Sequence, residues 1–121
     1  ARESGSRILV TTEIDDAARG ADYLYTDVWT SMGQEKETIL RCKAFKKYCI
    51  TMDLLRRCAP QAKIMHCLPA HRGEEIDNEA IESTQSIVFD QAENRMHVQK
   101  AIMCALMGKT FRLKQLKNNT E

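Results

Sequence analysis

Asp27 and Ser31 stand four positions apart in the stretch D-V-W-T-S-M-G, residues 27–33. A carboxylate can bind an ammonium group, a hydroxyl can bridge to it, and free loop amides can hold a carboxylate. Gly33 lets the backbone turn tightly at the end of the stretch. These residue types suit an α-amino acid as ligand. An Asx turn followed by a helix cap would use the same side chains, so both interpretations stay open.

Cys67 follows a predicted strand within the segment His66-Cys67-Leu68-Pro69. Pro69 disfavours helix at Leu68 and holds that residue extended, which leaves the Leu68 carbonyl available to a ligand. Cys67 can equally be a small packing residue, because most free cysteines are buried and inert. Its position favours a site, since open α/β sheets bind ligands beyond the carboxyl ends of their strands.

Arg95 lies in a predicted helix over residues 90–107, which Glu93 is placed to begin with a capping box. The apolar stripe of this helix runs through Val98, Ala101, Ile102, Ala105 and Leu106. Arg95 shares the face of that stripe, so we expect a packed guanidinium with an anionic partner, because an unpaired buried charge is costly. The partner is either a carboxylate of the protein or a phosphate or carboxylate of a ligand.

The charged stretch beyond the cysteine segment is interpreted as a solvated run rather than a second catalytic group. It comprises His71, Arg72, Glu74 and Glu75. Trp29 is expected to pack down the loop that holds Asp27. No metal and no cofactor are expected, because His66-Cys67 is the only adjacent His-Cys pair and neighbouring side chains of an extended segment point apart.

Short apolar runs alternate with helical patterns along the chain. Strands are predicted at residues 7–11, 22–26, 63–66 and 86–89, with a short extended piece at 48–51. Helices are predicted at 13–19, 34–45, 52–58, 77–82 and 90–107, with Thr51 as one N-cap. This alternation predicts an α/β fold with a parallel sheet covered by helices on both faces.

A complete domain of this class would contain further strand-helix units. We therefore expect a fold truncated at its N-terminus, with a partial domain over 1–108 and a C-terminal tail over 109–121.

The composition is that of an ordinary soluble globular protein, with 43% hydrophobic and 29% charged residues. The formal net charge is +1, from 18 basic and 17 acidic residues, so no global field favours a nucleic acid or a membrane as partner. Five cysteines form no C-x-x-C pair, and their odd number does not suit a closed disulfide framework. A reducing, cytoplasmic location is the expectation.

Three clusters taken together resemble the ornithine carbamoyltransferases: D-V-W-T-S-M-G-Q-E at 27–35, H-C-L-P at 66–69 and A-E-N-R at 92–95. The similarity runs over nearly the whole chain in the family's order and approximate spacing. The stretch A-H-R-G-E-E at 70–75 looks like the bacterial-type branch. The resemblance implies a Rossmann-like ornithine-binding domain. It also implies a reaction in which the δ-amine of ornithine attacks carbamoyl phosphate, giving citrulline and phosphate.

The resemblance implies that Asp27 and Ser31 hold the α-amino group of ornithine, while the Met32 amide binds its α-carboxylate. It implies that Cys67 sits beside the δ-amino group and assists its deprotonation. A Cys67 pKa lowered by Arg95 or by a bound ligand would fit this role.

For carbamoyl phosphate, the resemblance implies that the Leu68 carbonyl receives the carbamoyl NH2 group and that Arg95 binds the carbamoyl oxygen region. Cys67 belongs to the same site. The Leu68-Pro69 peptide bond would be cis.

Members of the family carry an S-T-R-T-type phosphate loop and an H-P-x-Q-type segment, and this sequence contains neither. We therefore expect no turnover by this chain alone. The resemblance implies a homotrimer for the full-length enzyme, with sites between subunits. The alternatives are a carbamoyltransferase for another amine, such as putrescine or aspartate, and a non-catalytic α/β binding module.

Overall fold

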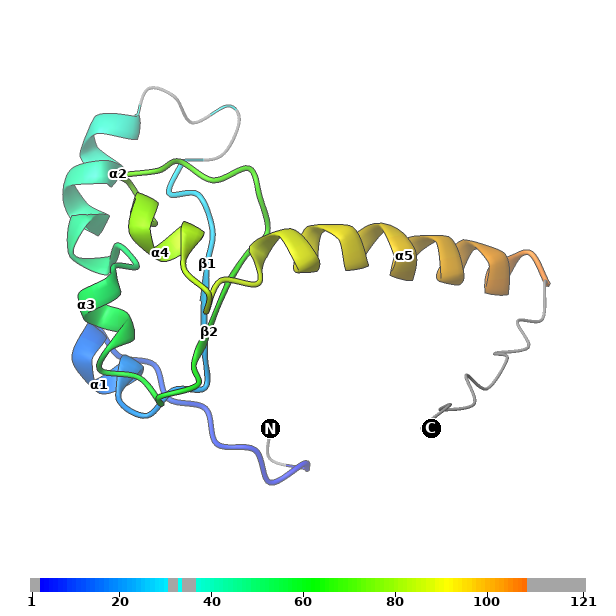
Figure 1. Cartoon of the computed structure of the whole chain (residues 1–121), viewed down its shortest axis with the longest axis horizontal. Helices are drawn as coiled ribbons and strands as arrows, with labels where there is room; N and C mark the ends of the chain where they lie inside the picture. Colours follow the sequence, from blue (N-terminus) through cyan, green and yellow to red (C-terminus); the bar gives the residue numbers. More distant parts are fainter. Residues whose placement is uncertain (1–2, 31–32, 34–36, 109–121) are drawn as a thin grey trace, which may run out of the picture.

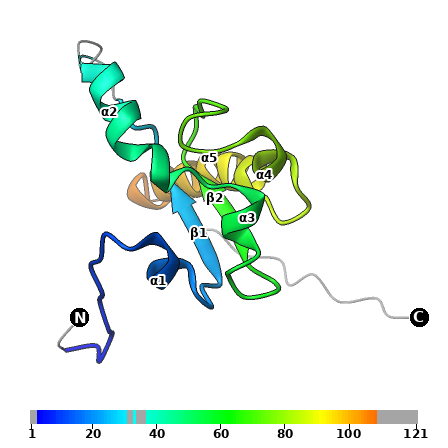
Figure 2. The ribbon, with the colours of Figure 1, turned by 90° about the vertical axis from the view of Figure 1, so that its left-hand side faces the viewer.

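A small parallel sheet organises the fold. The computed structural model describes residues 3–30, 33 and 37–108. In it β1 (Tyr23–Thr26) pairs in parallel with β2 (Lys63–His66), with Thr26 opposite His66 at their carboxyl ends. Helices lie between and around the strands, so the chain is a mixed α/β structure. Figure 2 shows the two strands side by side and places α2 beyond the carboxyl end of β1.

The helices lie on two sides of the sheet. They are α1 (Ile14–Ala18), α2 (Thr38–Phe45), the 3-10 helix η2 (Lys46–Tyr48), α3 (Met52–Leu55), α4 (Asn78–Glu82) and α5 (Val88–Leu106). In Figure 1, α1, α3 and α4 lie on one side of the strands, and α5 extends away on the other. None of the helices in the described ranges is long and apolar enough to cross a membrane.

Side-chain caps set the starts of two short helices. Thr51 accepts a hydrogen bond from the Leu54 amide at 3.2 Å, which confirms the predicted N-cap of α3. Asp77 accepts one from the Ala80 amide at 2.6 Å and so begins α4. An acceptor at this position satisfies an amide that the first turn of a helix leaves unpaired.

The core lies between the sheet and the helices on one side of it. In β2 the side chains of Ile64 and His66 are fully buried, while those of Lys63 and Met65 are half-buried, as the two-residue period of a strand requires. The buried apolar residues are Ala18, Ile50, Leu54, Leu55, Ala62, Ile64, Ile76, Ala80, Ile81 and Val88.

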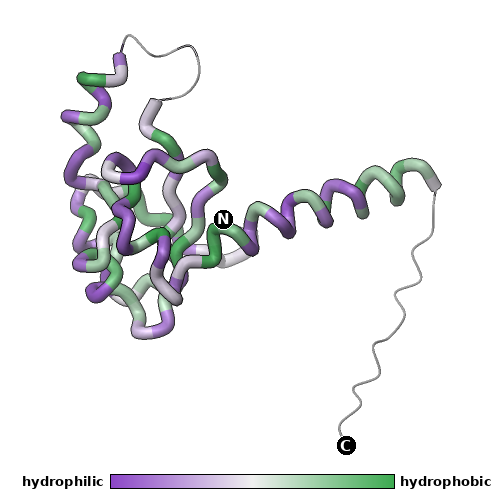
Figure 3. Tube along the Cα trace, turned by 45° about the horizontal axis from the view of Figure 1, so that its top comes forward, coloured by the Kyte–Doolittle hydropathy of each residue, from purple (hydrophilic) through white to green (hydrophobic). Residues whose placement is uncertain are grey.

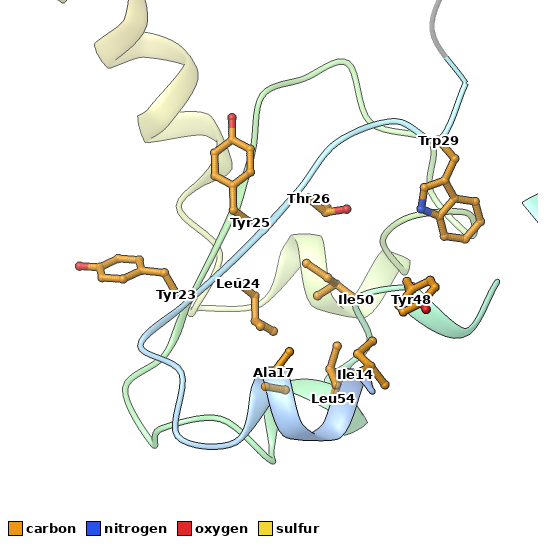
Figure 4. A pocket seen from close by; sticks show the side chains of 11 residues that line it. Ile14, Ala17, Tyr23, Leu24, Tyr25, Thr26, Trp29, Tyr48, Ile50 and Leu54 are labelled. Carbon is orange, nitrogen blue, oxygen red and sulfur yellow. The ribbon is translucent and has the colours of Figure 1, made fainter. Parts of the chain in front are cut away.

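The packing leaves a hollow of about 380 Å³ beside β1. In Figure 4, Leu24 points toward Ile50 and the side chains of α1 and α3, whereas Tyr23 and Tyr25 point to the opposite side of the strand. Both tyrosines are more than half exposed. The lining is largely apolar, so this hollow belongs to the core side of the sheet rather than to a polar site.

Two predicted strands are wrong. Residues 7–11 are exposed, with Val10 at 92%, and none of the described residues pairs with them. A strand needs a neighbour for its backbone hydrogen bonds, so an apolar run without one does not become a strand. Residues 86–89 form a single bridge, from Ser86 to Ile64, before α5 begins at Val88.

The predicted packing of the last helix is also wrong. Only Val88 of α5 is buried, and Val98 is 56% exposed. The helix touches β2 at its start and then runs beyond the sheet, so nothing in the described part of the chain covers its apolar stripe (Figures 1 and 3). No side chain caps α5, and Glu93 lies 3.3 Å from His97 Nε2 instead of forming a capping box. The predicted tail, 109–121, lies outside the described residues.

Shortening one core side chain tests the assignment of β2 to the centre of the fold. Ile64→Val should lower the free energy of unfolding by about 0.5–1.5 kcal/mol, because it removes one methylene group from a fully buried site. Ile39→Val in α2 is the matched control, since Ile39 is 84% exposed, and should change stability by less than about 0.5 kcal/mol. Urea unfolding followed by circular dichroism measures both, and equal effects would contradict the assignment.

Candidate functional site

The carboxyl ends of β1 and β2 bring two predicted site residues into contact. Because Thr26 and His66 are partners in the sheet, Asp27 and Cys67 follow side by side. The Cys67 thiol donates a hydrogen bond to Asp27 Oδ1 at 2.9 Å, and the Val28 amide donates to the same oxygen at 2.7 Å. Residues 40 positions apart in sequence thus form one polar pair at the mouth of the sheet.

This contact moves the two pKa values in opposite directions. The thiol hydrogen bond, followed by the Val28 amide, lowers the pKa of Asp27 below its ordinary value. Burial raises the pKa of Cys67, and the hydrogen bond to Asp27 and its negative charge raise it further. The predicted lowering of the Cys67 pKa is therefore wrong in this state. The carboxylate, not Arg95, is the charge next to the sulfur, and it stabilises the protonated thiol.

Arg95 faces the same region from α5. It lines an open hollow of about 380 Å³ whose other lining residues are Tyr25, Cys67, Gln91, Ala92, Asn94 and Val98. The predicted burial of Arg95 is wrong, because its helix face is exposed. Among residues 3–30, 33 and 37–108, no carboxylate forms an ion pair with it. The guanidinium, a donor fork suited to oxyanions, is thus presented beside Cys67 without a protein partner in that part of the chain.

Leu68 has an unusual backbone. Its φ of 53° lies in the left-handed region, so the predicted extended conformation is wrong. The Leu68-Pro69 bond is cis, as the resemblance implied. The Leu68 amide donates to His66 Nδ1 at 2.8 Å. No group in the described ranges donates to its carbonyl oxygen, which stays available to a ligand.

A buried imidazole and carboxylate hold this turn in place. His66 Nδ1 accepts from the Leu68 amide, so the ring proton is assigned to Nε2, which donates to Glu75 Oε1 at 3.0 Å. The His71 amide donates to the same oxygen at 2.6 Å. Both His66 and Glu75 are 0% exposed, so the interpretation of Glu75 as part of a solvated run is wrong.

Gln91 was missed by sequence reasoning. Its Oε1 accepts from the His66 amide at 3.1 Å, and its Nε2 donates to the Tyr25 hydroxyl at 3.3 Å. The side chain therefore joins the start of α5 to both strands. Gln91 precedes Arg95 by four positions, which puts the two residues on one face of the helix. This spacing is the feature of the sequence that could have indicated that Gln91 lies near the site.

The loop after β1 is held by aromatic packing. The rings of Trp29 and Phe45 lie 6.2 Å apart between centroids, which confirms that Trp29 packs this loop. Arg41 Nη1 donates to the Trp29 carbonyl at 3.4 Å. Ser31 and Met32 lie outside the described residues, so their predicted contacts stay predictions.

Comparison with known proteins gives consistent matches. Residues 1–106 match the family model described as aspartate/ornithine carbamoyltransferase, Asp/Orn binding domain. The ornithine carbamoyltransferase of Methanoculleus marisnigri is 54% identical over 89% of this chain and 35% of its own length. The chain spans about a third of the length of the curated relatives it matches.

Solved structures of carbamoyltransferases also match the fold of this chain. The ornithine carbamoyltransferase of Pyrococcus furiosus superposes with a TM-score of 0.73 at 48% identity, over 81% of this chain and 31% of that one. An N-acetyl-L-ornithine transcarbamylase superposes with a TM-score of 0.74 at 33% identity, over 87% of this chain and 32% of that one.

The Asp27–Cys67 contact makes the thiol less reactive than an isolated one. Asp27→Asn should lower the Cys67 pKa toward its ordinary value, because it removes the negative charge that stabilises the thiol. Alkylation of Cys67 by iodoacetamide at pH 8 should become severalfold faster, since the thiolate is the reacting form. Peptide mass mapping follows this cysteine separately from the others.

Asp22→Asn, at an exposed position before β1, is the matched control and should leave the rate unchanged. A rate in Asp27→Asn that is equal to or below that of the parent would contradict the contact.

Proposed function

The chain belongs to the aspartate/ornithine carbamoyltransferase family, and we propose that it supplies the ornithine-binding side of an ornithine carbamoyltransferase site. The complete enzyme would transfer the carbamoyl group of carbamoyl phosphate to the δ-amino group of ornithine, yielding citrulline and phosphate. A further domain of the complete enzyme would hold most of the carbamoyl phosphate.

One observation carries the proposal. The Cys67 thiol contacts the Asp27 carboxylate at 2.9 Å while Arg95 lines the hollow that Cys67 opens into. An anion for an ammonium group, a titratable group for proton transfer and a cation for an oxyanion thus meet at one edge of the sheet. The carboxylate suits recognition of the amino acid, while proton removal from the amine and stabilisation of the oxyanion are what carbamoyl transfer needs.

Asp27 is the proposed partner of the α-ammonium group of ornithine. Its lowered pKa keeps the carboxylate charged at neutral pH, which suits a cationic ligand. Ser31 would share the ammonium group and the Met32 amide would bind the α-carboxylate. These two assignments rest on the resemblance of residues 27–35 to the family motif.

Cys67 is the proposed catalytic residue, acting next to the δ-amine. Attack needs a neutral amine, so the δ-ammonium must first give up a proton. An ammonium group bound to Asp27 would offset the negative charge that, after burial, raises the Cys67 pKa. Binding of the α-ammonium group of ornithine would therefore favour the Cys67 thiolate, which then assists deprotonation of the δ-ammonium group.

Arg95 and Leu68 are proposed to hold the carbamoyl group, with Cys67 beside it. As the new C–N bond forms, negative charge develops on the carbonyl oxygen, where the Arg95 guanidinium would stabilise it. The Leu68 carbonyl would accept hydrogen bonds from the carbamoyl NH2 group. Collapse of the tetrahedral intermediate breaks the C–O bond to phosphate, which leaves with the bonding electrons.

The proposal also covers the fold, the oligomeric state and the location of the complete protein. We propose a larger Rossmann-like sheet with helices on both faces, because α1, α3 and α4 lie on one side of the strands and α5 on the other. Residues 1–108 would form part of that domain and 109–121 a tail. A homotrimer and a cytoplasmic location are proposed for the full-length protein.

A related acceptor is the second candidate. An N-acetyl-L-ornithine transcarbamylase matches the fold with a TM-score of 0.74. In either acceptor the group on the α-carbon nitrogen would lie next to Asp27. The charge of that group therefore distinguishes ornithine from an N-acetylated acceptor. Ornithine offers Asp27 an ammonium, whereas an N-acetylated acceptor offers a neutral amide.

A chimera tests both candidates. Residues 1–106 would replace the matching segment of the Methanoculleus marisnigri relative, and citrulline formation would be compared with carbamoylation of N-acetylornithine, aspartate and putrescine. Ornithine should be preferred by at least about tenfold in kcat/KM. A chimera that binds carbamoyl phosphate but prefers another amine would overturn the ornithine assignment.

Two substitutions in the chimera separate the proposed roles. Cys67→Ser should lower kcat by about 10²-fold or more with little change in the KM for carbamoyl phosphate, because the sulfur acts on the amine. Arg95→Ala should also raise that KM about tenfold or more, because it removes an anion contact. Arg56→Ala, at an exposed ion pair with Asp53, is the control and should change neither. Identical effects of the first two would count against these roles.

A further inference from the structure

The turn after Pro69 gathers three possible metal ligands that the proposed reaction does not use. His71, Glu74 and Glu75 each offer a nitrogen or carboxylate oxygen, and these atoms lie within 4.8 Å of one another. His71 is exposed, Glu74 is half-buried and Glu75 is fully buried, so the group runs from the surface into the protein.

Glu75 supplies the observation that points to a ligand. Its Oε1 accepts hydrogen bonds from His66 and from the His71 amide, whereas its Oε2 is buried with no hydrogen-bond partner among the described residues. His71 Nδ1 lies 3.9 Å from this oxygen. Leaving a buried carboxylate oxygen unpaired costs free energy, so this oxygen is prepared for a positively charged partner.

Backbone contacts hold the three side chains near one another. The Glu74 amide donates to the His71 carbonyl at 3.1 Å, and the Ile50 amide donates to the Glu75 carbonyl at 2.9 Å. The Cys42 thiol of α2 donates to Glu74 Oε2 at 3.4 Å and so orients that carboxylate. The three metal-binding side chains are therefore held in place by the turn itself, by the segment before α3 and by α2.

We propose that His71 Nδ1, a Glu74 carboxylate oxygen and Glu75 Oε2 bind a divalent transition-metal ion of the zinc type. Zinc bonds to nitrogen and oxygen are about 2.0–2.2 Å long, so tetrahedral ligand atoms stand roughly 3.3–3.6 Å apart. His71 Nδ1 and Glu75 Oε2 are 3.9 Å apart, and the three ligand atoms lie within 4.8 Å of one another, so rotation of the more exposed His71 and Glu74 side chains would have to close the set around the ion. An imidazole with two carboxylates favours zinc or cobalt over magnesium, which prefers all-oxygen octahedral sites.

The ion would act on the catalytic turn through Glu75. Oε1 of Glu75 orients His66, which in turn receives the Leu68 amide. A metal on Oε2 would thus stiffen the support of Cys67 and Leu68 without touching the substrates. Among the described residues, His and Cys neighbours in sequence give no metal site, whereas the tight turn after Pro69 brings one histidine together with two carboxylates.

Titration of the chain with Co²⁺, with Zn²⁺ as competitor, tests the site. The Cys67→Ser variant serves as parent, because the thiol–carboxylate pair at the strand ends is another place where such an ion can bind. One equivalent of Co²⁺ should bind, Zn²⁺ should displace it, and excess Mg²⁺ should not. His71→Ala and Glu74→Gln should each weaken binding by at least about tenfold.

His97→Ala is the matched control. His97 Nε2 lies 3.3 Å from Glu93 Oε1 on the exposed face of α5, so it is a His–carboxylate pair to which no third ligand from the described residues is added. Its removal should leave affinity unchanged, and circular dichroism should show that all variants remain folded. Absence of binding by the parent, equal affinity in His71→Ala, or equal loss in His97→Ala would overturn the proposal. Such a result would leave His71 Nδ1 and Glu75 Oε2 as neighbours without a metal ion and would not affect the carbamoyl-transfer assignment.

Discussion

The buried contact between His66 and Glu75 is the interaction on which the rest of the site depends. His66 ends β2, and Glu75 lies at the far side of the turn that carries Cys67 and Leu68. The His66 ring also accepts a hydrogen bond from the Leu68 amide. One imidazole therefore contacts both the start of the turn, at Leu68, and its end, at Glu75. A carboxyl group can be buried in this place because His66 and the His71 amide both donate hydrogen bonds to its Oε1.

Parallel pairing supplies the second constraint. The register that sets Thr26 opposite His66 delivers Asp27 and Cys67 to the same edge, and Gln91 fastens the start of α5 to that edge. The resulting charge pattern is a carboxylate that stabilises a protonated thiol, with a guanidinium on the open side. The site is therefore arranged to respond to a cationic ligand, since a ligand that neutralises Asp27 also changes the state of Cys67.

Some sequence patterns did not become structure because their partners are non-local. Residues 7–11 are as apolar and β-branched as a strand should be, yet they remain exposed, with no neighbouring strand among the residues that the structure describes. The stripe on α5 is periodic, but periodicity states which residues share a face and not what covers that face. The burial of Arg95 was predicted wrongly for the same reason. Its helix was correctly predicted, and its burial depended on a surface that the described residues do not provide.

The sequence by itself determined the local features: the strands at residues 22–26 and 63–66, the Thr51 cap and the motifs around Asp27, Cys67 and Arg95. Propensities, caps and motifs act over a few residues, so they can be recognised along the chain. Only the tertiary structure decided that Asp27 touches Cys67, that the thiol pKa rises, and that Glu75 is buried beside His66. These outcomes depend on distance and solvent exclusion between segments far apart in sequence, which no local pattern encodes.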